Sequence, residues 1–217
     1  MPPDLFPVPD PWSKLRADFA RLVAERPAGG YRLLLTDWPW EIQMRSEKGY
    51  EKSPQRHYKC IPTDIINSLP WGMLAAPDSV CLQWSTAPML KLQMAVLEAA
   101  GFTYKSYVPW FKGSPNSSGE DPDDPDWNAA FGGGYIFRSC SEIMLVGTRG
   151  NPTLLPERRK LRAAFFGPQR EHSRKPDEQY SHAEALSPGP MIELFSRTDR
   201  AGWVSFGDMS GKFGEAR

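Results

Sequence analysis

Apolar residues recur at helical spacing near the start of the chain. The pattern covers residues 15–23, follows Ser13 and stops before Pro27 and a pair of glycines. Ser is a residue type that caps helix N-termini, whereas Pro and Gly end helices. We therefore expect a short helix that Ser13 caps and that ends before Pro27, within an N-terminal extension at residues 1–30.

Short apolar runs alternate with helical patterns over the rest of the chain. Runs typical of buried strands stand at residues 31–36, 79–84, 104–111, 142–148, 191–195 and 203–206. Helical patterns stand at residues 63–69, 89–99 and 175–186. In the helix at 89–99 the expected apolar face consists of Met89, Leu92, Ala95, Val96 and Ala99. Strands that alternate with helices in this way predict an α/β fold built on a parallel sheet.

Two stretches follow neither pattern, and we expect both to be long loops. Residues 113–134 are rich in Gly, Pro and Asp, and residues 149–170 are irregular. No internal repeat is present, which argues against a solenoid or a propeller. The sequence therefore predicts a single domain over residues 1–217 that carries two long loops.

Composition excludes several classes of protein. No apolar run approaches the roughly 20 residues of a membrane span, so no membrane association is expected. The 26 Lys and Arg residues balance the 26 Asp and Glu residues, so any nucleic-acid binding requires a local basic patch. Three widely spaced cysteines and the absence of a C-x-x-C motif predict neither a disulfide framework nor a metal site. The first twelve residues lack the features of a secretory signal, and we expect a cytoplasmic protein.

The segment Asp37-Trp38-Pro39-Trp40 comes directly after the first buried run. In parallel sheets, ligands bind beside the carboxyl ends of the strands. A carboxylate can accept hydrogen bonds from the exocyclic amine of a nucleobase, and an aromatic ring can stack on the base. The same residues also suit an Asp that caps a turn and indoles that fill a core. The segment alone leaves both interpretations open.

This segment resembles the D-P-P-W catalytic motif of S-adenosylmethionine-dependent amino-group methyltransferases. Further segments between Tyr31 and Gly211 are similar to the MT-A70 family, which contains the catalytic subunit of the eukaryotic messenger-RNA adenosine-N6 methyltransferase and many bacterial and phage members. The similar segments are Tyr58 with the helix after it, LAAPDSVCLQW, GFTYKSYVPWFK, GYIFRSCSEIMLVGTRG, REHSRKPDEQY, and SPGPMIELFSR followed by GW and FGD. The blocks HSRKPDE and PGPMIELFSR are specific in combination.

The resemblance implies a fold, a cofactor and a set of residues that bind it. The fold is a Rossmann-like methyltransferase fold with a central, mostly parallel sheet flanked by helices and with permuted motif order. The cofactor is S-adenosylmethionine, and Lys175 is expected to pair with the carboxylate of its methionine part. The residues expected around its nucleoside are Glu193, Phe195, Arg197 and Asp208. Without the resemblance, Lys175 also suits a solvated first turn of a helix and Phe195 a simple core position.

Methyl transfer to the N6 amine of adenine gives the motif a chemical role. The lone pair of that amine is delocalised into the ring, so the amine must pyramidalise before it reacts. Asp37 and the backbone carbonyl of Trp38 are expected to accept its two N–H groups and to favour the developing positive charge. Trp40 is expected to stack on the base, and Pro39 completes the catalytic loop. The adenine must be unpaired or flipped out of its stack.

Two positions depart from the family pattern. Trp38 replaces the first Pro of D-P-P-W, which removes a fixed φ angle and puts the rigidity of the loop in doubt. Asp208 stands where the family usually has Asn, and an ionised Asp accepts hydrogen bonds but donates none. Neither change removes the reacting carboxylate.

Basic residues are concentrated in the second predicted loop and after it. They are Arg158, Arg159, Lys160, Arg162, Arg170, Arg174 and Lys175. Such a patch can neutralise phosphates, although a solvated loop would have the same composition. Substrate contacts are expected at Arg158, Arg159, Lys160 and Arg174, and also at Tyr58, Lys112 and Arg138, of which the last two flank the first loop.

We therefore expect an N6-adenine methyltransferase that acts on DNA with low sequence specificity. RNA is the alternative substrate. A second hypothesis is a catalytically weak subunit that binds nucleic acid beside an active methyltransferase, and a third is a methyltransferase of small amines. The chain can form a homodimer, or a heterodimer with a second methyltransferase-like subunit.

Overall fold

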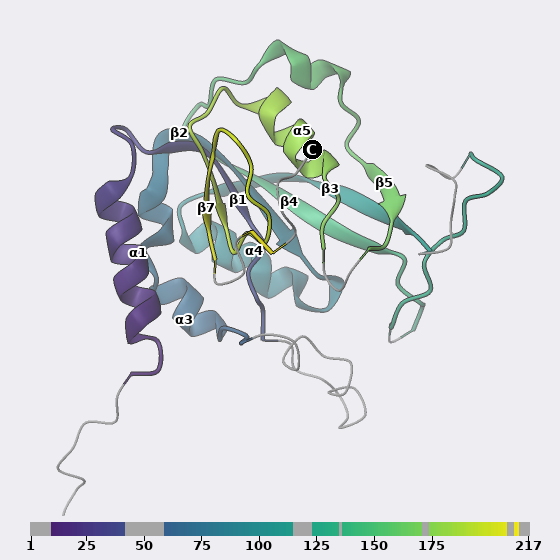
Figure 1. Ribbon diagram of the computed structural model, residues 1–217, viewed down its shortest axis with the longest axis horizontal. Coiled ribbons are helices and arrows are strands. Elements are labelled where there is room, and N and C mark those ends of the chain that lie inside the picture. The colour runs from purple at the N-terminus through teal and green to yellow at the C-terminus, as the bar shows by residue number, and fades with distance from the viewer. Residues whose placement is uncertain are drawn as a thin grey trace, which may run out of the picture.

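The apolar run YRLLLT forms the strand β1 (Tyr31–Thr36) at the heart of a seven-stranded sheet with the order β5-β3-β4-β2-β1-β6-β7. The computed structural model describes residues 10–41, 59–114, 123–134, 136–170, 174–207 and 211–212. The other strands are β2 (Ala75–Ser85), β3 (Thr103–Gly113), β4 (Ser141–Arg149), β5 (Phe165–Pro168), β6 (Met191–Leu194) and β7 (Trp203–Phe206). The predicted α/β class, with a mostly parallel sheet flanked by helices, is confirmed (Figure 1).

The strands β2 and β3 run in the same direction, but they are not neighbours. The strand β4 lies between them and is antiparallel to both. The remaining neighbouring pairs are all parallel. Because β4 runs against the other strands, it begins at the edge of the sheet where they end.

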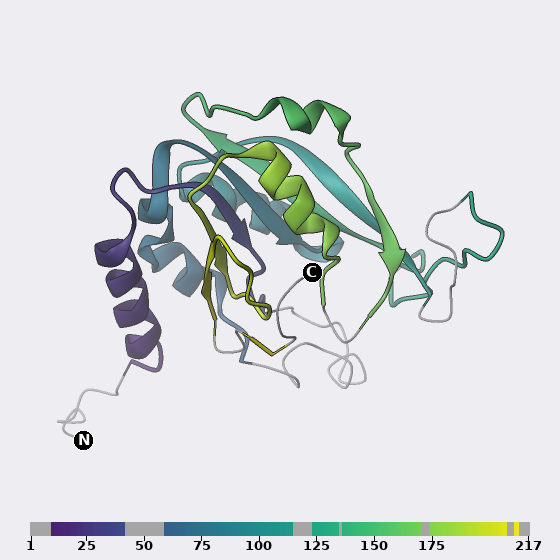
Figure 2. The ribbon, with the colours of Figure 1, turned by 45° about the horizontal axis from the view of Figure 1, so that its top comes forward.

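Helices cover both faces of the sheet because the central strands are apolar on both sides. Leu34 packs into one core together with Phe19 of α1 (Ser13–Glu25), Ile66 of α3 (Thr63–Ser68) and Val96 of α4 (Leu90–Ala99). Leu33 and Leu35 point to the opposite core, which contains Ala183 of α5 (Glu178–Leu186). Figure 2 shows α5 in front of one face of the sheet, α3 and α4 behind the sheet, and α1 at its left-hand side.

The apolar face predicted for the helix at 89–99 is partly wrong. The buried residues of α4 are Gln93, Val96 and Leu97, whereas Leu92 is exposed. Gln93 belongs inside because its amide oxygen accepts the Thr86 N–H at 2.8 Å. A polar side chain can occupy a core position when a backbone group satisfies it, and an apolar pattern does not detect this.

Helix boundaries also differ from the predictions. The N-cap of α1 is Trp12 rather than Ser13, and Asp10 accepts the Trp12 N–H at 3.0 Å. The helix α5 begins three residues later than expected, after Pro176, because a residue before Pro avoids the helical conformation. The predicted loop at 149–170 contains the short helix η4 (Pro156–Lys160) and the edge strand β5.

Two further short helices complete the described structure. They are η2 (Pro70–Leu74) and η3 (Ala87–Met89), which lead into β2 and α4. Within the described part of the chain, no helix has the length and apolar character needed to cross a membrane.

Candidate functional site

The strands β1, β3 and β4 bring polar side chains to one edge of the sheet, and β6 ends there as well. Asp37 follows β1, and its N–H donates to the carbonyl of Leu194, the last residue of β6, at 3.2 Å. Lys112 lies near the end of β3, and Glu142 is the second residue of the antiparallel β4. The edge that holds the carboxyl ends of parallel strands is where α/β folds bind ligands.

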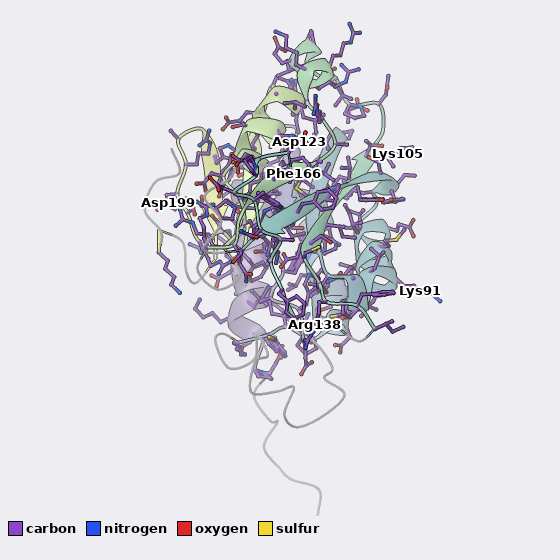
Figure 3. All side chains as sticks on the ribbon, turned by 90° about the vertical axis from the view of Figure 1, so that its right-hand side faces the viewer. Lys91, Lys105, Asp123, Arg138, Phe166 and Asp199 are labelled. Carbon is purple, nitrogen blue, oxygen red and sulfur yellow. The ribbon has the colours of Figure 1, made fainter. Side chains whose placement is uncertain are left out.

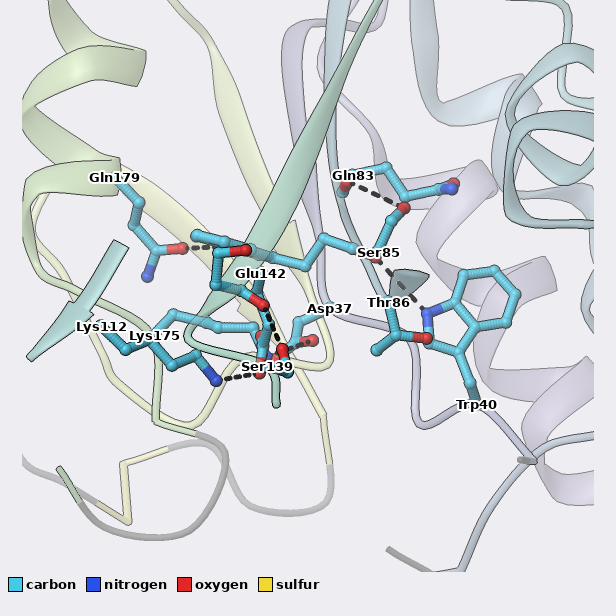
Figure 4. Close-up of polar contacts among 12 residues, drawn as sticks. Asp37, Trp40, Gln83, Ser85, Thr86, Lys112, Ser139, Glu142, Lys175 and Gln179 are labelled. Carbon is cyan, nitrogen blue, oxygen red and sulfur yellow. Dashed lines mark hydrogen bonds and ion pairs between the residues drawn. The ribbon is translucent and has the colours of Figure 1, made fainter. Parts of the chain in front are cut away.

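At this edge, charged side chains form a continuous network (Figure 4). Lys175 Nζ lies 3.1 Å from Asp37 Oδ1 and 3.3 Å from Glu142 Oε2. Glu142 also pairs with Lys112, and Asp37 Oδ2 lies 3.7 Å from Arg197 Nη2. The Lys175 side chain is 8% exposed and that of Asp37 is 17% exposed. The network therefore shields Asp37 from most of the solvent while leaving it partly accessible.

Burial and charge act against each other within the network. Burial alone would raise the pKa of Glu142, but Lys175 and Lys112 outweigh it and lower this pKa to about 2. Burial would lower the pKa of Lys175, but Asp37 and Glu142 outweigh it and raise this pKa. Both groups are consequently charged at neutral pH.

Packing and backbone hydrogen bonds hold the D-W-P-W segment. The Trp40 N–H donates to the Trp38 carbonyl, and the Ile61 N–H donates to the Pro39 carbonyl, both at 2.8 Å. The Trp38 indole is buried and lies 5.4 Å from the ring of Trp71 and 4.9 Å from that of Phe195. An aromatic cluster thus anchors the loop at the position where the family pattern has its first Pro.

The structure buries Trp40, the ring that we expect to stack on a base. Trp40 is 5% exposed and belongs to the core on the α1 side of the sheet. Its Nε1 donates to the Trp84 carbonyl at 3.4 Å. The ring is therefore enclosed by protein and presents no free face to a nucleobase.

A cavity of about 240 Å³ opens beside the network. The D-W-P-W segment contributes Asp37, Trp38 and Pro39 to its wall, and the segment after β6 contributes Phe195, Ser196 and Arg197. The opposite wall comes from the N-terminal extension and includes Trp12, Leu15 and Asp18. Lys59 Nζ lies 4.0 Å from the centroid of the Trp12 ring. Sequence patterns gave no sign that the first helix lines a cavity.

Phe195 adopts an unusual backbone conformation at this wall. Its φ is +62°, in the left-handed region that L-residues other than Gly rarely adopt. The ring packs against Trp38 and lies 5.9 Å from that of Phe206. Strained residues of this kind are often found at ligand sites, and the packing here holds Phe195 in place.

Glu193 does not line the cavity, in contrast to the expectation that it contacts a nucleoside. Its Oε2 accepts the hydroxyl of Tyr180 at 2.9 Å and that of Ser196 at 2.8 Å. Burial raises the pKa of Glu193 to about 7, although both hydrogen bonds act in the opposite direction. Glu193 therefore supports Ser196, which is itself part of the wall.

The predicted basic patch does not form a single surface. Arg158, Arg159 and Lys160 lie on η4, which follows the end of β4. That end pairs with the start of β2, at the edge of the sheet opposite Asp37 (Figures 1 and 2). These three residues, which we expect to contact the substrate, therefore lie away from Asp37.

The remaining predicted substrate residues differ in position. Lys112 is part of the network, whereas Arg174 lies 3.9 Å from Asp177 and is largely buried. Arg138 is exposed on the segment that leads into β4. Tyr58 and Asp208 lie outside the described residues. Glu142 was missed, although a Glu that interrupts an otherwise apolar strand was a signal available in the sequence.

Comparison with known proteins gives matches over most of the chain. The MT-A70 family model matches residues 31–209. A putative N(6)-adenosine-methyltransferase MT-A70-like from Medicago truncatula is 27% identical over 187 residues, which cover 83% of this chain and 26% of that protein. An N(6)-adenosine-methyltransferase MT-A70-like protein from Drosophila melanogaster is 26% identical over 188 residues, with 83% and 27% covered.

A type II methyltransferase, M.MunI from Mycoplasma sp, is 23% identical over 198 residues. The match covers 83% of this chain and 78% of that protein. By contrast, the chain spans about a quarter of the length of the plant and insect relatives.

Proposed function

The chain belongs to the MT-A70 family of methyltransferases, and we propose that it transfers a methyl group from S-adenosylmethionine to the N6 amine of adenine in DNA, with low sequence specificity. The observation that carries this proposal is the position of Asp37. Its carboxylate lies at a cavity wall between two cations, Lys175 and Arg197. A carboxylate in this position can accept hydrogen bonds from an amine.

The cavity suits the proposed cofactor. Phe195 and Phe206 provide aromatic surface for its adenine, and Arg197 provides a cation for its carboxylate. The buried Trp38 Nε1 has no hydrogen-bond partner among the described residues, and an acceptor atom of a ligand would satisfy this donor. When bound, S-adenosylmethionine supplies a methyl group on a positively charged sulfonium.

In the proposed reaction, Asp37 accepts a hydrogen bond from the amine of the target adenine. The Trp38 carbonyl accepts the Trp40 N–H, and its second lone pair remains available to the amine. These acceptors favour the positive charge that develops on N6, and fixed groups of this kind need no reorganisation during the reaction. Lys175 and Arg197 hold the Asp37 carboxylate in position.

The choice of DNA rests on the relatives. The chain covers 78% of a type II methyltransferase, whereas the N(6)-adenosine-methyltransferase-like relatives support RNA as the alternative. The site itself favours neither polymer, because the amine of adenine is the same in both.

Methyl transfer from labelled S-adenosylmethionine to single- and double-stranded DNA and to RNA tests the proposal. We expect N6-methyladenine in DNA with the wild type and with Asp64→Ala, a control at an exposed carboxylate of α3. Asp37→Ala should lower the rate by at least about a hundredfold. Label found in RNA alone would show that RNA, and not DNA, is the substrate. Folded protein that binds nucleic acid without transferring label would favour the hypothesis of a partner subunit.

A further inference from the structure

Aromatic side chains line one face of the sheet at its β3–β5 end. Tyr107 and Phe111 lie four residues apart on β3 and therefore point to the same face. Phe166 of β5 is the register partner of Phe111, and their rings stack with centroids 5.4 Å apart at 15°. The ring of Trp127 meets Phe166 edge-on at 6.4 Å. We call these four residues the aromatic row.

The aromatic row lies on the face that α4 covers only in part. Trp110 and Phe165, the chain neighbours of the stacked pair, point to the other face and are buried in the core beneath α5. Tyr104, near the start of β3, still packs against the core that contains α4. Beyond it, Tyr107 is 52% exposed and Phe111 is 39% exposed. Contiguous exposed aromatic surface of this kind marks an interaction site.

A cation lies at each end of the row. Lys105 is exposed at the irregularity in β3 just before Tyr107. At the other end, Ser141 pairs with Phe111, and the exposed Arg138 comes three residues before Ser141. Figure 3 looks onto this end of the sheet, with Phe166 near the middle and Lys105 and Arg138 on different sides of it.

Carboxylates precede Trp127 along the chain and include Asp124 and Asp126. Asp124 Oδ1 accepts the Asp126 N–H at 2.9 Å, and the Asp124 carbonyl accepts the Trp127 N–H at the same distance. These groups therefore shape the turn that presents Trp127. Their charge limits where a phosphate can approach and leaves the β3 side of the row as the favoured path.

We propose that the aromatic row binds unpaired bases of the nucleic-acid strand that carries the target adenine. This proposal rests on the proposed function. From Tyr107 to Phe111 the row extends for about 13 Å, whereas stacked bases are about 3.4 Å apart. The row can thus hold more than one base, while Lys105 and Arg138 contact the phosphates. Phe111 is followed along β3 by Lys112, whose side chain points to the other face and pairs with Glu142 of the network, so a strand that leaves the row passes around the end of β3 to reach the edge that holds Asp37.

Single-stranded nucleic acid fits this surface better than a second copy of the chain does. Base stacking on aromatic rings, combined with cations along the backbone, is the way in which proteins bind single strands without sequence preference. A surface that pairs with its own copy would bring Lys105 and Arg138 into a buried contact, where charged groups are depleted. The arrangement also explains how a chain of low specificity can hold its substrate.

Fluorescence with the full chain tests the proposal. The probe is a short single-stranded DNA with one adenine and a neighbouring 2-aminopurine, whose emission falls when it stacks. We expect Tyr107→Ala/Phe111→Ala to raise the Kd at least about tenfold and to restore the emission. Phe111→Tyr should bind like the wild type, and Phe111→Leu should not, because a leucine keeps apolar surface but cannot stack. Lys105→Ala and Arg138→Ala should each reduce the salt dependence of binding by about one phosphate contact.

Controls separate the two proposals. Met73→Ala, at an exposed apolar residue of η2, should change nothing, and cofactor binding measured by calorimetry should be equal in all variants. If the wild type and the variants bind and methylate DNA equally well, the proposal for the aromatic row is overturned and the proposed function stands. A wild type that neither binds nor methylates nucleic acid would overturn both proposals. Sedimentation could instead show that the wild type is a dimer and that the variants are monomers with an unchanged Kd for DNA. That result would assign the aromatic row to a contact between two copies of the chain and overturn its proposed role in binding bases.

Discussion

Lys175 Nζ lies 3.1 Å from Asp37 Oδ1, so the cation that the family resemblance assigns to the cofactor is bonded to the carboxylate that we assign to the target amine. The same ammonium lies 3.3 Å from Glu142 Oε2. A ligand carboxylate that approached Lys175 would therefore compete with two protein carboxylates. Under the proposed function, this shared cation would couple the binding of cofactor to the charge around Asp37.

Replacing Lys175 by Met should destabilise the protein as well as weaken cofactor binding. The change leaves Asp37 and Glu142 close together without the cation between them, and the loss of one partner of a buried pair costs about 3 kcal/mol. Urea unfolding at pH 7 measures the loss. Lys14→Met, at the exposed Lys14–Asp18 pair of α1, is the matched control and should have almost no effect.

A double variant tests whether the loss comes from the network. Asp37→Asn should offset part of the effect of Lys175→Met, because it removes one of the uncompensated carboxylates. The free energies of unfolding of the two single variants and the double variant then give a coupling of at least about 1 kcal/mol. Simple additivity would show that Lys175 does not stabilise the fold through its pair with Asp37.

Glu193 should make the stability fall as the pH rises between about 4.5 and about 7. Its folded-state pKa is raised from 4.5 to about 7, so over this range the folded protein retains a proton that the unfolded chain releases. The contribution amounts to about 3 kcal/mol. We expect Glu193→Gln to remove this dependence, which urea unfolding at pH 5 and pH 8 measures.

The sign of the Glu193 effect is distinctive. Relative to the wild type, Glu193→Gln should be more stable at pH 8 than at pH 5, whereas the exposed Glu98→Gln should show the same small difference at both. A stability difference for Glu193→Gln that is independent of pH would show that the folded protein holds this carboxylate ionised throughout.

Much of this fold could be predicted from apolar patterns, because a strand buried on both faces has a distinctive composition. The run at 31–36 is such a case, and it places Asp37 correctly at a strand end. The insertion of β4 between β2 and β3 is different, because strand order depends on long-range pairing that no local pattern records. The short edge strand β5 was missed for a related reason, since its four residues are too few to show a period.

The candidate site was predictable where chemistry dictated the residue type, and less so where packing did. Asp37, Lys175 and Arg197 come together as the motifs suggest. The sequence does not show whether the two indoles of the motif face a ligand or the protein. In the structure both are buried in the aromatic core. Only the three-dimensional arrangement shows that Trp40 faces protein rather than a ligand.

Trp40→Phe should therefore affect stability more than catalysis. The change keeps most of the packing but removes the hydrogen bond from Nε1 to the Trp84 carbonyl, which contributes about 1 kcal/mol. We expect the KM for DNA to stay within a factor of two of the wild type, about 0.4 kcal/mol. Steady-state kinetics would contradict this view if the KM rose strongly, since only a ring that contacts the base would have that effect.

Trp38→Pro restores the family motif but should destabilise this protein. Trp38 packs against Phe195 and Trp71 in the core, and loss of a buried aromatic side chain costs about 3–5 kcal/mol. Thermal unfolding should show a lower Tm for Trp38→Pro than for Trp38→Phe, which keeps a ring. Equal stability of Trp38→Pro and the wild type would mean that the fixed φ of Pro compensates for the lost packing.

The basic residues of η4 should contribute little to substrate binding, because η4 lies at the edge of the sheet opposite Asp37. At 0.15 M salt the Debye length is about 8 Å. Charges at the opposite edge of the sheet are therefore largely screened from the site. Arg158→Ala/Arg159→Ala/Lys160→Ala should change the Kd for DNA by less than about twofold and leave its salt dependence intact. Lys112→Ala is the matched comparison, since Lys112 belongs to the network at the site, and it should weaken binding more. A steep loss of affinity in the triple variant would require the DNA to contact both edges of the sheet at once.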